Sequence, residues 1–301
     1  MSWFIFAIIA LLCWSGSDFF SKIGCRDSHD KYSQFKMVMA VGLIMGIHAV
    51  FEIINGVQIS WQILWTYLPV SLLYIGSMAL GYIGLRYIEL SISSPICNAS
   101  GALVAIIAIL TGTAGKMDPI QYVAITLPCI GVIGLGFVEA NEDDTLRAAR
   151  QEASNYKYAK SWLALALPIA YCLLDAAGTF ADDLVLETLN EDSANVAYEL
   201  TFFAAGVCCF IYTVLIRKQS LVPDLERPKY IGAIFETAGQ FAYIYALSSG
   251  NSALAAPIIS SYCAASVLWS RLFLKEKLSW KHYACICVTF IGIVIMGVYD
   301  M

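Results

Sequence analysis

Long apolar stretches alternate with short polar connections along most of this chain. A helix needs about 20 apolar residues to cross the hydrocarbon core of a bilayer, and ten stretches have roughly that length. The predicted spans cover residues 3–21, 34–54, 65–86, 92–113, 119–138, 161–181, 194–216, 229–248, 252–273 and 281–299. The pattern therefore predicts an all-α membrane protein with ten transmembrane helices.

Only one connection between the predicted spans is long. It covers residues 139–160, EANEDDTLRAARQEASNYKYAK, and it is polar throughout. We interpret it as a linker between a first five-span repeat, residues 1–138, and a second, residues 161–301. A five-span unit has an odd number of crossings, so a duplicated copy would cross the membrane upside down. Inverted repeats of this kind are typical of secondary transporters, whose substrate site lies near the midplane.

Short matches between the halves support a duplication. Ser2-Trp3 recurs as Ser161-Trp162, and Ser94-Pro95-Ile96 corresponds to Ala256-Pro257-Ile258. The two prolines are predicted at first-turn helix positions, where proline fits well. We therefore expect two inverted five-helix repeats related across the linker.

The basic residues predict how the chain is oriented. Every lysine and arginine except Lys116 falls at the connections after the first, third, fifth, seventh and ninth spans. The positive-inside rule places these connections, and with them the linker, in the cytoplasm. Both termini are then outside. The connection after the sixth span is also predicted outside, because it carries acids and no base: Asp182, Asp183, Glu187, Glu191 and Asp192.

Composition excludes several classes of protein. Hydrophobic residues make up 59% of the chain, charged residues 14%, and the mean hydropathy is +0.70, far from a soluble domain or a nucleic-acid-binding protein. The ten cysteines lie mostly in apolar runs and show no C-x-x-C spacing. The chain has three histidines and neither a zinc motif nor a nucleophile elbow. We predict no enzyme activity, no catalytic residue, no metal site and no cofactor.

Two stretches resemble a known family. Residues 79–96, ALGYIGLRYIELSISSPI, and the late stretch RLFLKEKLSWKHYACICVTFIGIVIMG are similar to hallmark segments of EamA-type members of the drug/metabolite transporter superfamily. The resemblance covers essentially the whole chain and implies a ten-span small-molecule transporter or exchanger of the cell membrane. In LTGTAGKMDPIQ, Gly115 and Lys116 stand about where the family has an acid, so Glu276 in the later hallmark is interpreted as a turn or salt-bridge residue. Members carry many kinds of metabolite, so the resemblance does not identify the substrate.

Three acids lie inside predicted spans, where an ionisable side chain usually faces a cavity or a partner. Glu236 lies about 10 Å along the eighth span and Asp175 about 21 Å along the sixth, at 1.5 Å per residue, so both are near the midplane. Asp18 is closer to the cytoplasmic end of the first span. Glu236, Gln240 and Tyr243 share one helical stripe.

Further polar and aromatic residues extend this predicted site. Tyr74 is the counterpart of Glu236 in the first repeat, and Tyr82 lies on the same helix face as Tyr74. The predicted substrate-binding residues are Glu236, Gln240, Tyr243, Tyr74, Tyr82, Trp14, Asn98 and Tyr262, and the predicted coupling residues are Asp175 and Asp18.

A carboxylate among aromatic rings suits an organic cation, because the rings add cation–π attraction. The first hypothesis is therefore a secondary transporter of an organic cation, amine or amino acid. In the alternative, Glu236 carries a coupling proton and the substrate is a neutral metabolite or nucleobase. A third interpretation makes Glu236 a protonated, purely structural carboxyl group.

The expected partners are the lipid bilayer, a small-molecule substrate and, under the alternative, protons. Ten spans can form a complete carrier, which favours a monomer. A dimer through the close-packing stretch GLIMG, with Gly42 and Gly46, is the other possibility.

Overall fold

The computed structural model describes residues 2–27, 30–88, 90–112, 115–141, 145, 162–249, 252–275 and 277–300. In this part of the chain all regular structure is helical. The helices are α1 (Ser2–Cys25), α2 (Ser33–Ile54), α3 (Trp61–Tyr87), α4 (Leu90–Cys97), α5 (Ser100–Thr111), α6 (Pro119–Ala140), α8 (Trp162–Leu186), α9 (Glu191–Phe210) with a π-helical continuation (Ile211–Ile216), α10 (Pro223–Ser249), α11 (Ser252–Ser260), α12 (Tyr262–Phe273) and α13 (Trp280–Asp300).

The predicted spans correspond to these helices, and eight of them have the length and composition of a membrane span. Within the described residues, eight helical stretches are long and apolar enough to cross a bilayer. The two remaining predicted spans fall on α8 and α10, which are 25 and 27 residues long. An all-helical, multi-pass membrane protein is therefore confirmed, while the count of ten spans stays a prediction.

The outer surface of the bundle is apolar, as contact with lipid requires. Large hydrophobic side chains are widely exposed on helices from both halves, for example Leu72, Leu110, Phe137 and Val294. Several polar and charged side chains are buried in the interior, including Ser71, Asn98 and Glu199. An apolar surface around a partly polar interior is expected for a protein surrounded by a bilayer and not by water.

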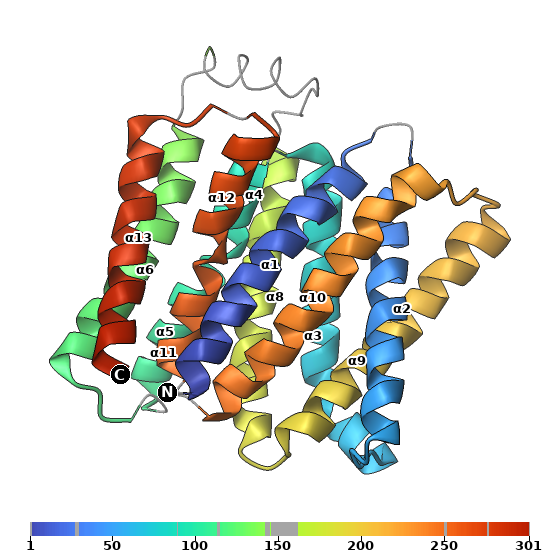
Figure 1. The fold of residues 1–301 in the computed structure, drawn as a ribbon, viewed down its shortest axis with the longest axis horizontal. Helices are drawn as coiled ribbons and strands as arrows, with labels where there is room; N and C mark the ends of the chain where they lie inside the picture. Colours follow the sequence, from blue (N-terminus) through green and yellow to red (C-terminus); the bar gives the residue numbers. More distant parts are fainter. Residues whose placement is uncertain are drawn as a thin grey trace.

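Helices from the two halves pack in pairs across the molecule. Helix α1 packs along α10, α3 along α8, α2 along α9, and α6 along α13. Figure 1 shows α1 beside α10 in the centre and α13 beside α6 at one side, with both termini at the same end of the bundle. Exchanging the halves would leave this set of pairs unchanged. The inverted repeat itself remains a prediction.

Side-chain caps and a left-handed glycine mark several helix ends. Ser60 accepts a hydrogen bond from the Ile63 amide at the start of α3. Asn190 accepts hydrogen bonds from the amides of Asp192 and Ser193 at the start of α9. These caps satisfy amide groups that lack partners within the helix. Helix α5 ends at Gly112, whose φ of 80° places it in the left-handed region that glycine tolerates.

Gly42 and Gly46 pack within the chain. A Cβ atom on Gly42 would lie 2.7 Å from the Phe202 carbonyl oxygen and 2.9 Å from the Gly206 Cα. A Cβ on Gly46 would meet the ring of Phe203. The GLIMG stretch therefore brings α2 against α9 of the same molecule, and these two glycines are occupied by an internal contact.

The two prolines lie near breaks in helices, and the prediction of first-turn positions is wrong. Pro95 is the sixth residue of α4, and Asn98 and Ala99 interrupt the helix before α5 begins. Pro257 is likewise the sixth residue of α11, which ends before the turn at Ser261. Proline lacks an amide hydrogen and clashes with the preceding turn, so a helix kinks or breaks close to it.

The acidic connection predicted after the sixth span is partly helix. Helix α8 continues to Leu186, and Asp182 is fully buried within it. Asp182 accepts a hydrogen bond from the Tyr67 hydroxyl at 2.6 Å. The prediction that Asp182 belongs to a connection is therefore wrong: it lies on α8, where a hydroxyl partner from α3 satisfies its carboxyl group, and the side of the membrane stays a prediction.

Four charged side chains form a closed ring of ion pairs at the end of the bundle where α10 begins. The Lys36 ammonium lies 3.1 Å from Asp30 and 3.0 Å from Glu226. The Lys229 ammonium lies 3.0 Å from Asp30 and 3.1 Å from Glu226. All four side chains are buried. The α1–α2 connection, α2 and α10 are thus held together by four ion pairs without net charge.

Removing one cation should open this ring. We predict that Lys229→Met lowers the free energy of unfolding by about 3–5 kcal/mol, because two buried carboxylates lose a partner. Thermal unfolding in detergent measures the effect. The control Lys281→Met removes an exposed lysine of α13 and should change stability by less than about 0.5 kcal/mol. Equal melting temperatures for the two variants would contradict this account of the ring.

The ring also predicts a pH dependence. Burial alone would raise the pKa of Asp30, but hydrogen bonds and charge from Lys229 and Lys36 hold that pKa below its ordinary value. A lowered carboxyl pKa stabilises the fold above the ordinary value, and this stabilisation is lost as the pH falls through the lowered one. Asp30→Asn should therefore be less stable than the wild type at pH 7, and the difference should shrink at strongly acidic pH. A difference independent of pH would refute the prediction.

Candidate functional site

A cavity lies in the middle of the bundle, among α1, α3, α4, α5, α8, α9, α10, α11 and α12. It encloses about 920 Å³, counting the part that is open to solvent. All ten residues predicted for the site line it: Glu236, Gln240, Tyr243, Tyr74, Tyr82, Trp14, Asn98, Tyr262, Asp175 and Asp18. The tertiary structure thus gathers these residues around one space, and their roles there stay predictions.

Glu236 lies where α1 and α10 are in close contact. The Ser17 hydroxyl of α1 donates a hydrogen bond to Glu236 Oε2 at 2.6 Å. Gly16 and Gly239 allow this approach, since a Cβ on Gly16 would lie 3.1 Å from the Phe235 ring and one on Gly239 would overlap the indole of Trp14. Glu236 is 9% exposed, so its carboxyl group is at the edge of the cavity and almost closed off.

Asp18 is held by serines of two broken helices. Its Oδ2 accepts hydrogen bonds from Ser94 of α4 at 2.5 Å and from Ser266 of α12 at 3.0 Å. On the other side of the cavity, Asp175 Oδ2 accepts a hydrogen bond from Ser100 of α5 at 2.7 Å. Both aspartates are partly exposed and line the cavity. Serine hydroxyls therefore orient the carboxyl groups without neutralising their charge.

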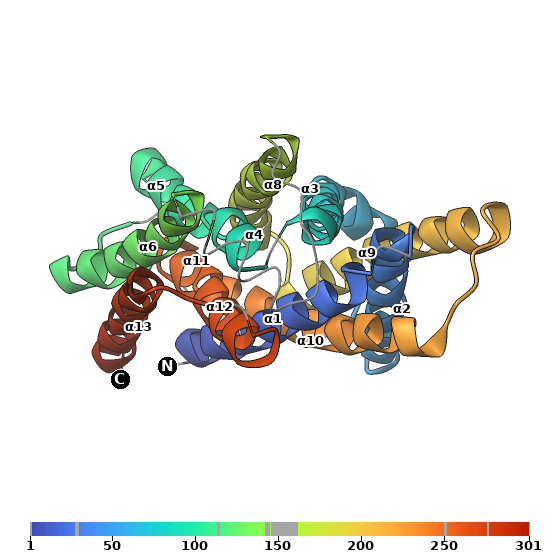
Figure 2. The same ribbon diagram turned by 90° about the horizontal axis from the view of Figure 1, so that it is seen from above.

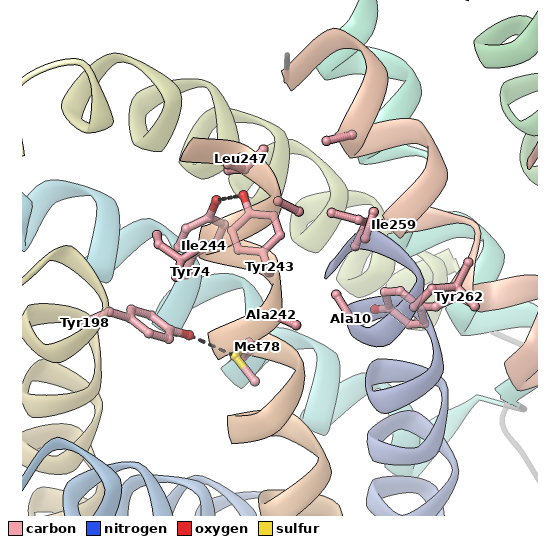
Figure 3. Packing of buried hydrophobic residues seen from close by; sticks show 14 of the residues in the cluster. Ala10, Tyr74, Met78, Tyr198, Ala242, Tyr243, Ile244, Leu247, Ile259 and Tyr262 are labelled. Carbon is pink, nitrogen blue, oxygen red and sulfur yellow. Dashed lines mark hydrogen bonds between the residues drawn. The ribbon is translucent and has the colours of Figure 1, made fainter. Parts of the chain in front are cut away.

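Tyrosines connect α3, α8 and α10 at one end of the cavity. The hydroxyl groups of Tyr74 and Tyr243 lie 2.5 Å apart, and Figure 3 shows the two rings pointing toward each other. Both hydroxyls donate to Thr179, at 3.2 Å and 3.3 Å. The Tyr74 hydroxyl also lies 3.4 Å from Asp182 Oδ2, which is an alternative acceptor for its single hydrogen. This network fixes the tyrosine rings that form part of the cavity wall.

Aromatic rings cover much of the wall between the acids. The Trp14 ring centroid lies 5.0 Å from that of Tyr243 and 5.8 Å from that of Tyr262. The ring of Tyr198 meets Tyr74 edge to face at 5.9 Å, and its hydroxyl donates to the Met78 sulfur (Figure 3). Rings placed next to carboxyl groups provide negative faces as well as apolar area.

Some polar atoms at the cavity have no hydrogen-bond partner. They include the Tyr82 hydroxyl, the Gln240 side-chain nitrogen and the Ser21 hydroxyl, and these three side chains are at least 95% buried. Buried polar groups are normally paired. No lysine, arginine or histidine contributes to the described lining. The cavity is therefore acidic and aromatic, with polar groups left to meet an occupant.

Sequence reasoning missed several residues of the wall. Tyr171 and Tyr198 line the cavity, although only their aromatic character within predicted spans hinted at it. Ser17, Ser94, Ser100 and Ser266 were missed because a serine in an apolar helix carries no signal of its own. Their partners, the three acids, were the only available indication. No group of three or more His, Cys, Asp or Glu side chains in the described residues is placed to hold a metal ion.

Most of the second half of the chain is similar to a known transporter family. Residues 162–298 match the model of the EamA-like transporter family. This match agrees with the resemblance that the late hallmark indicated.

Solved structures have the same fold as this protein over nearly its whole length. One is a crystal structure, described simply as that of a protein, with a TM-score of 0.68 and 13% sequence identity. The alignment covers 99% of this chain and 97% of the other, so the first half shares that fold as well. No curated protein matches the chain at a significant level.

Two predictions lie outside the described residues. Glu276 of the late hallmark is one, and most of the linker, residues 139–160, is the other.

The contact between α1 and α10 can be tested directly. We predict that Gly239→Ala destabilises the protein by about 1–3 kcal/mol, because the new methyl group overlaps Trp14 and well-packed interiors do not accept extra atoms. The control is Gly76→Ala on α3, where a Cβ would lie 3.6 Å from Leu174, an ordinary contact. Melting temperatures in detergent compare the two. A Gly239→Ala protein as stable as Gly76→Ala would show that α1 and α10 are further apart than described.

Proposed function

We propose that this protein is a secondary active transporter of a small organic cation, which it moves by alternating access. The observation that carries the proposal is the central cavity, where Glu236, Asp18 and Asp175 meet aromatic rings and no basic side chain contributes to the described lining. An unpaired carboxylate within a membrane is costly. A cation in the cavity would supply the missing charge.

The aromatic wall supports a cation of organic type. Trp14, Tyr243 and Tyr262 are close neighbours, and each ring adds cation–π attraction of about 0.5–2 kcal/mol to an ammonium group. A strongly hydrated inorganic ion would gain less from these apolar faces. Amines and quaternary ammonium compounds fit this combination. An amino acid fits less well, because its carboxylate would find no basic partner in the described lining.

Alternating access accounts for the arrangement of the helices. The helix pairs α1–α10 and α3–α8 each combine the two halves, and their exchange is consistent with two inverted five-helix repeats that rock around a central site. The cavity lies between the halves. The broken helices α4–α5 and α11–α12 contribute Ser94, Ser100 and Ser266 to it.

We further propose that the protein lies in the cell membrane with the ring of Asp30, Lys36, Glu226 and Lys229 on the cytoplasmic side. The ring is at the end of the bundle where the basic connections gather, and both termini lie at the opposite end (Figure 1), which would be outside. A functional monomer is favoured, because Gly42 and Gly46 are already packed against α9.

The alternative keeps Glu236 as a proton site for a neutral metabolite or nucleobase. One observation favours it, namely that Glu236 is nearly closed off and hydrogen-bonded by Ser17. Such a carboxyl group is better placed to exchange a proton than to touch a bulky substrate. The two hypotheses differ in which compounds evoke current and in whether a proton gradient is needed.

Substrate-evoked currents in proteoliposomes distinguish these hypotheses. We predict that amines and choline-like cations evoke a current, whereas nucleobases do not. Glu236→Gln should reduce the current at least about tenfold at both pH 6.5 and pH 8, because loss of one buried charge partner costs more than about 1.4 kcal/mol. The matched control Glu187→Gln removes an exposed acid beyond α8 and should leave the current unchanged.

A different result would reverse the assignment. Currents with neutral compounds alone, and only under an inward proton gradient, would contradict the cation hypothesis and support Glu236 as the proton site. Melting temperatures of both variants must match the wild type within a few degrees, so that a lost current reports on function and not on unfolding.

A further inference from the structure

The three acids of the cavity form two separate poles. Asp18 lies on α1, whose Ser17 donates to Glu236 of α10, and we count these two acids of the α1–α10 pair as one pole. Asp175 lies on α8 and makes the other. Seen from above, α1 and α8 stand on opposite sides of the bundle (Figure 2). Negative charge is therefore available at two walls of the same cavity.

The aspartates of the two poles are anchored reciprocally. Asp18 of the first half accepts a hydrogen bond from Ser266 of α12 in the second half. Asp175 of the second half accepts one from Ser100 of α5 in the first half. In each case an aspartate of one half meets a serine on a broken helix of the other half. The two poles are thus built alike, as the proposed exchange of halves would produce.

Each of these aspartates keeps one oxygen free for an occupant. The bonds from Ser94 and Ser266 both end on Asp18 Oδ2, and the bond from Ser100 ends on Asp175 Oδ2. Neither Oδ1 atom accepts a hydrogen bond from the described residues, and both side chains are partly exposed. An ammonium group is a strong hydrogen-bond donor that carries the complementary charge.

Two unpaired side chains point to an occupant that fills the space between the poles. The Tyr82 hydroxyl and the Gln240 side-chain nitrogen have no partner, although these side chains are only 5% and 3% exposed. They come from α3 and α10 and line the same cavity as both poles. A compound bearing one charge would satisfy a single pole and leave the other carboxylate unpaired.

We propose that the cargo carries two cationic groups, as an α,ω-diamine does, with one ammonium group at Asp175 and the other at Asp18 and Glu236. Its methylene chain lies along the aromatic wall that includes Trp14 and Tyr262. This inference rests on the proposed function, transport of an organic cation, and adds the number of charges. The site prefers a dication because only a dication pairs both poles at once.

Three compounds with four carbon atoms each test the number of charges. They are 1,4-diaminobutane with two ammonium groups, butylamine with one, and 4-aminobutyrate, in which a carboxylate replaces one aminomethyl group of the diamine. Binding of radiolabelled 1,4-diaminobutane and butylamine to the purified full-length protein is measured directly, and 4-aminobutyrate is tested as a competitor. We expect 1,4-diaminobutane to bind at least about tenfold more tightly than butylamine. Competition by 4-aminobutyrate should be weaker than by either amine.

Variants assign the second ammonium group to its pole. Asp175→Asn keeps the size of the side chain and removes its charge. We expect it to lower the affinity for 1,4-diaminobutane about tenfold, to the level of the affinity for butylamine. The affinity for butylamine should change less than about twofold. Retained butylamine binding demonstrates that the variant is folded. The control Asp224→Asn removes an exposed acid at the start of α10 and should change neither affinity.

Two results would overturn the inference, and they can be told apart. Equal affinity for the diamine and the monoamine, or an equal loss of both affinities in Asp175→Asn, would refute the proposal of a dicationic cargo. Transport of an organic cation would then remain the proposed function. If neither amine binds the wild type and neither evokes a current, the proposed function fails together with this inference.

Discussion

The cost of a carboxylate in the low-dielectric interior of a membrane governs this structure. Such a charge is tolerated where it finds a partner, water or a proton. The protein meets this constraint in two different ways. At one end, Asp30 and Glu226 are paired with two lysines in a closed ring. In the middle, Glu236, Asp18 and Asp175 are given serine hydroxyls but no basic side chain in the described lining.

This contrast separates a structural cluster from a functional one. A neutral ring of ion pairs needs nothing further, and it holds the α1–α2 connection against α10. The central acids are oriented but left without neutralising charge, and unpaired polar atoms of Tyr82 and Gln240 lie beside them. Sites that await a ligand often show such incomplete pairing, because the occupant provides the missing contacts. Under the alternating access proposed above, the ring would have to part when the central site opens toward it.

Close helix contacts make the central site possible. Gly16 and Gly239 bring α1 against α10, so that Ser17 reaches Glu236. Breaks beyond Pro95 and Pro257 divide two helices at the level of the cavity, and Ser94, Ser100 and Ser266 are positioned around those breaks. Small residues and broken helices are the usual means by which a helical bundle in lipid makes room for a polar site.

The sequence alone determined the helical class, the approximate helix limits and the acids that face inward, because each of these follows from local hydrophobicity and helical period. The stripe of Glu236, Gln240 and Tyr243 is an example, and so is the resemblance of the late hallmark to EamA-type proteins. Only the tertiary structure decided which partners meet. The Ser17–Glu236 and Ser100–Asp175 contacts, the burial of Asp182 and the use of Gly42 against Gly206 join residues far apart in the chain. Such contacts depend on packing between helices, and no local pattern encodes them.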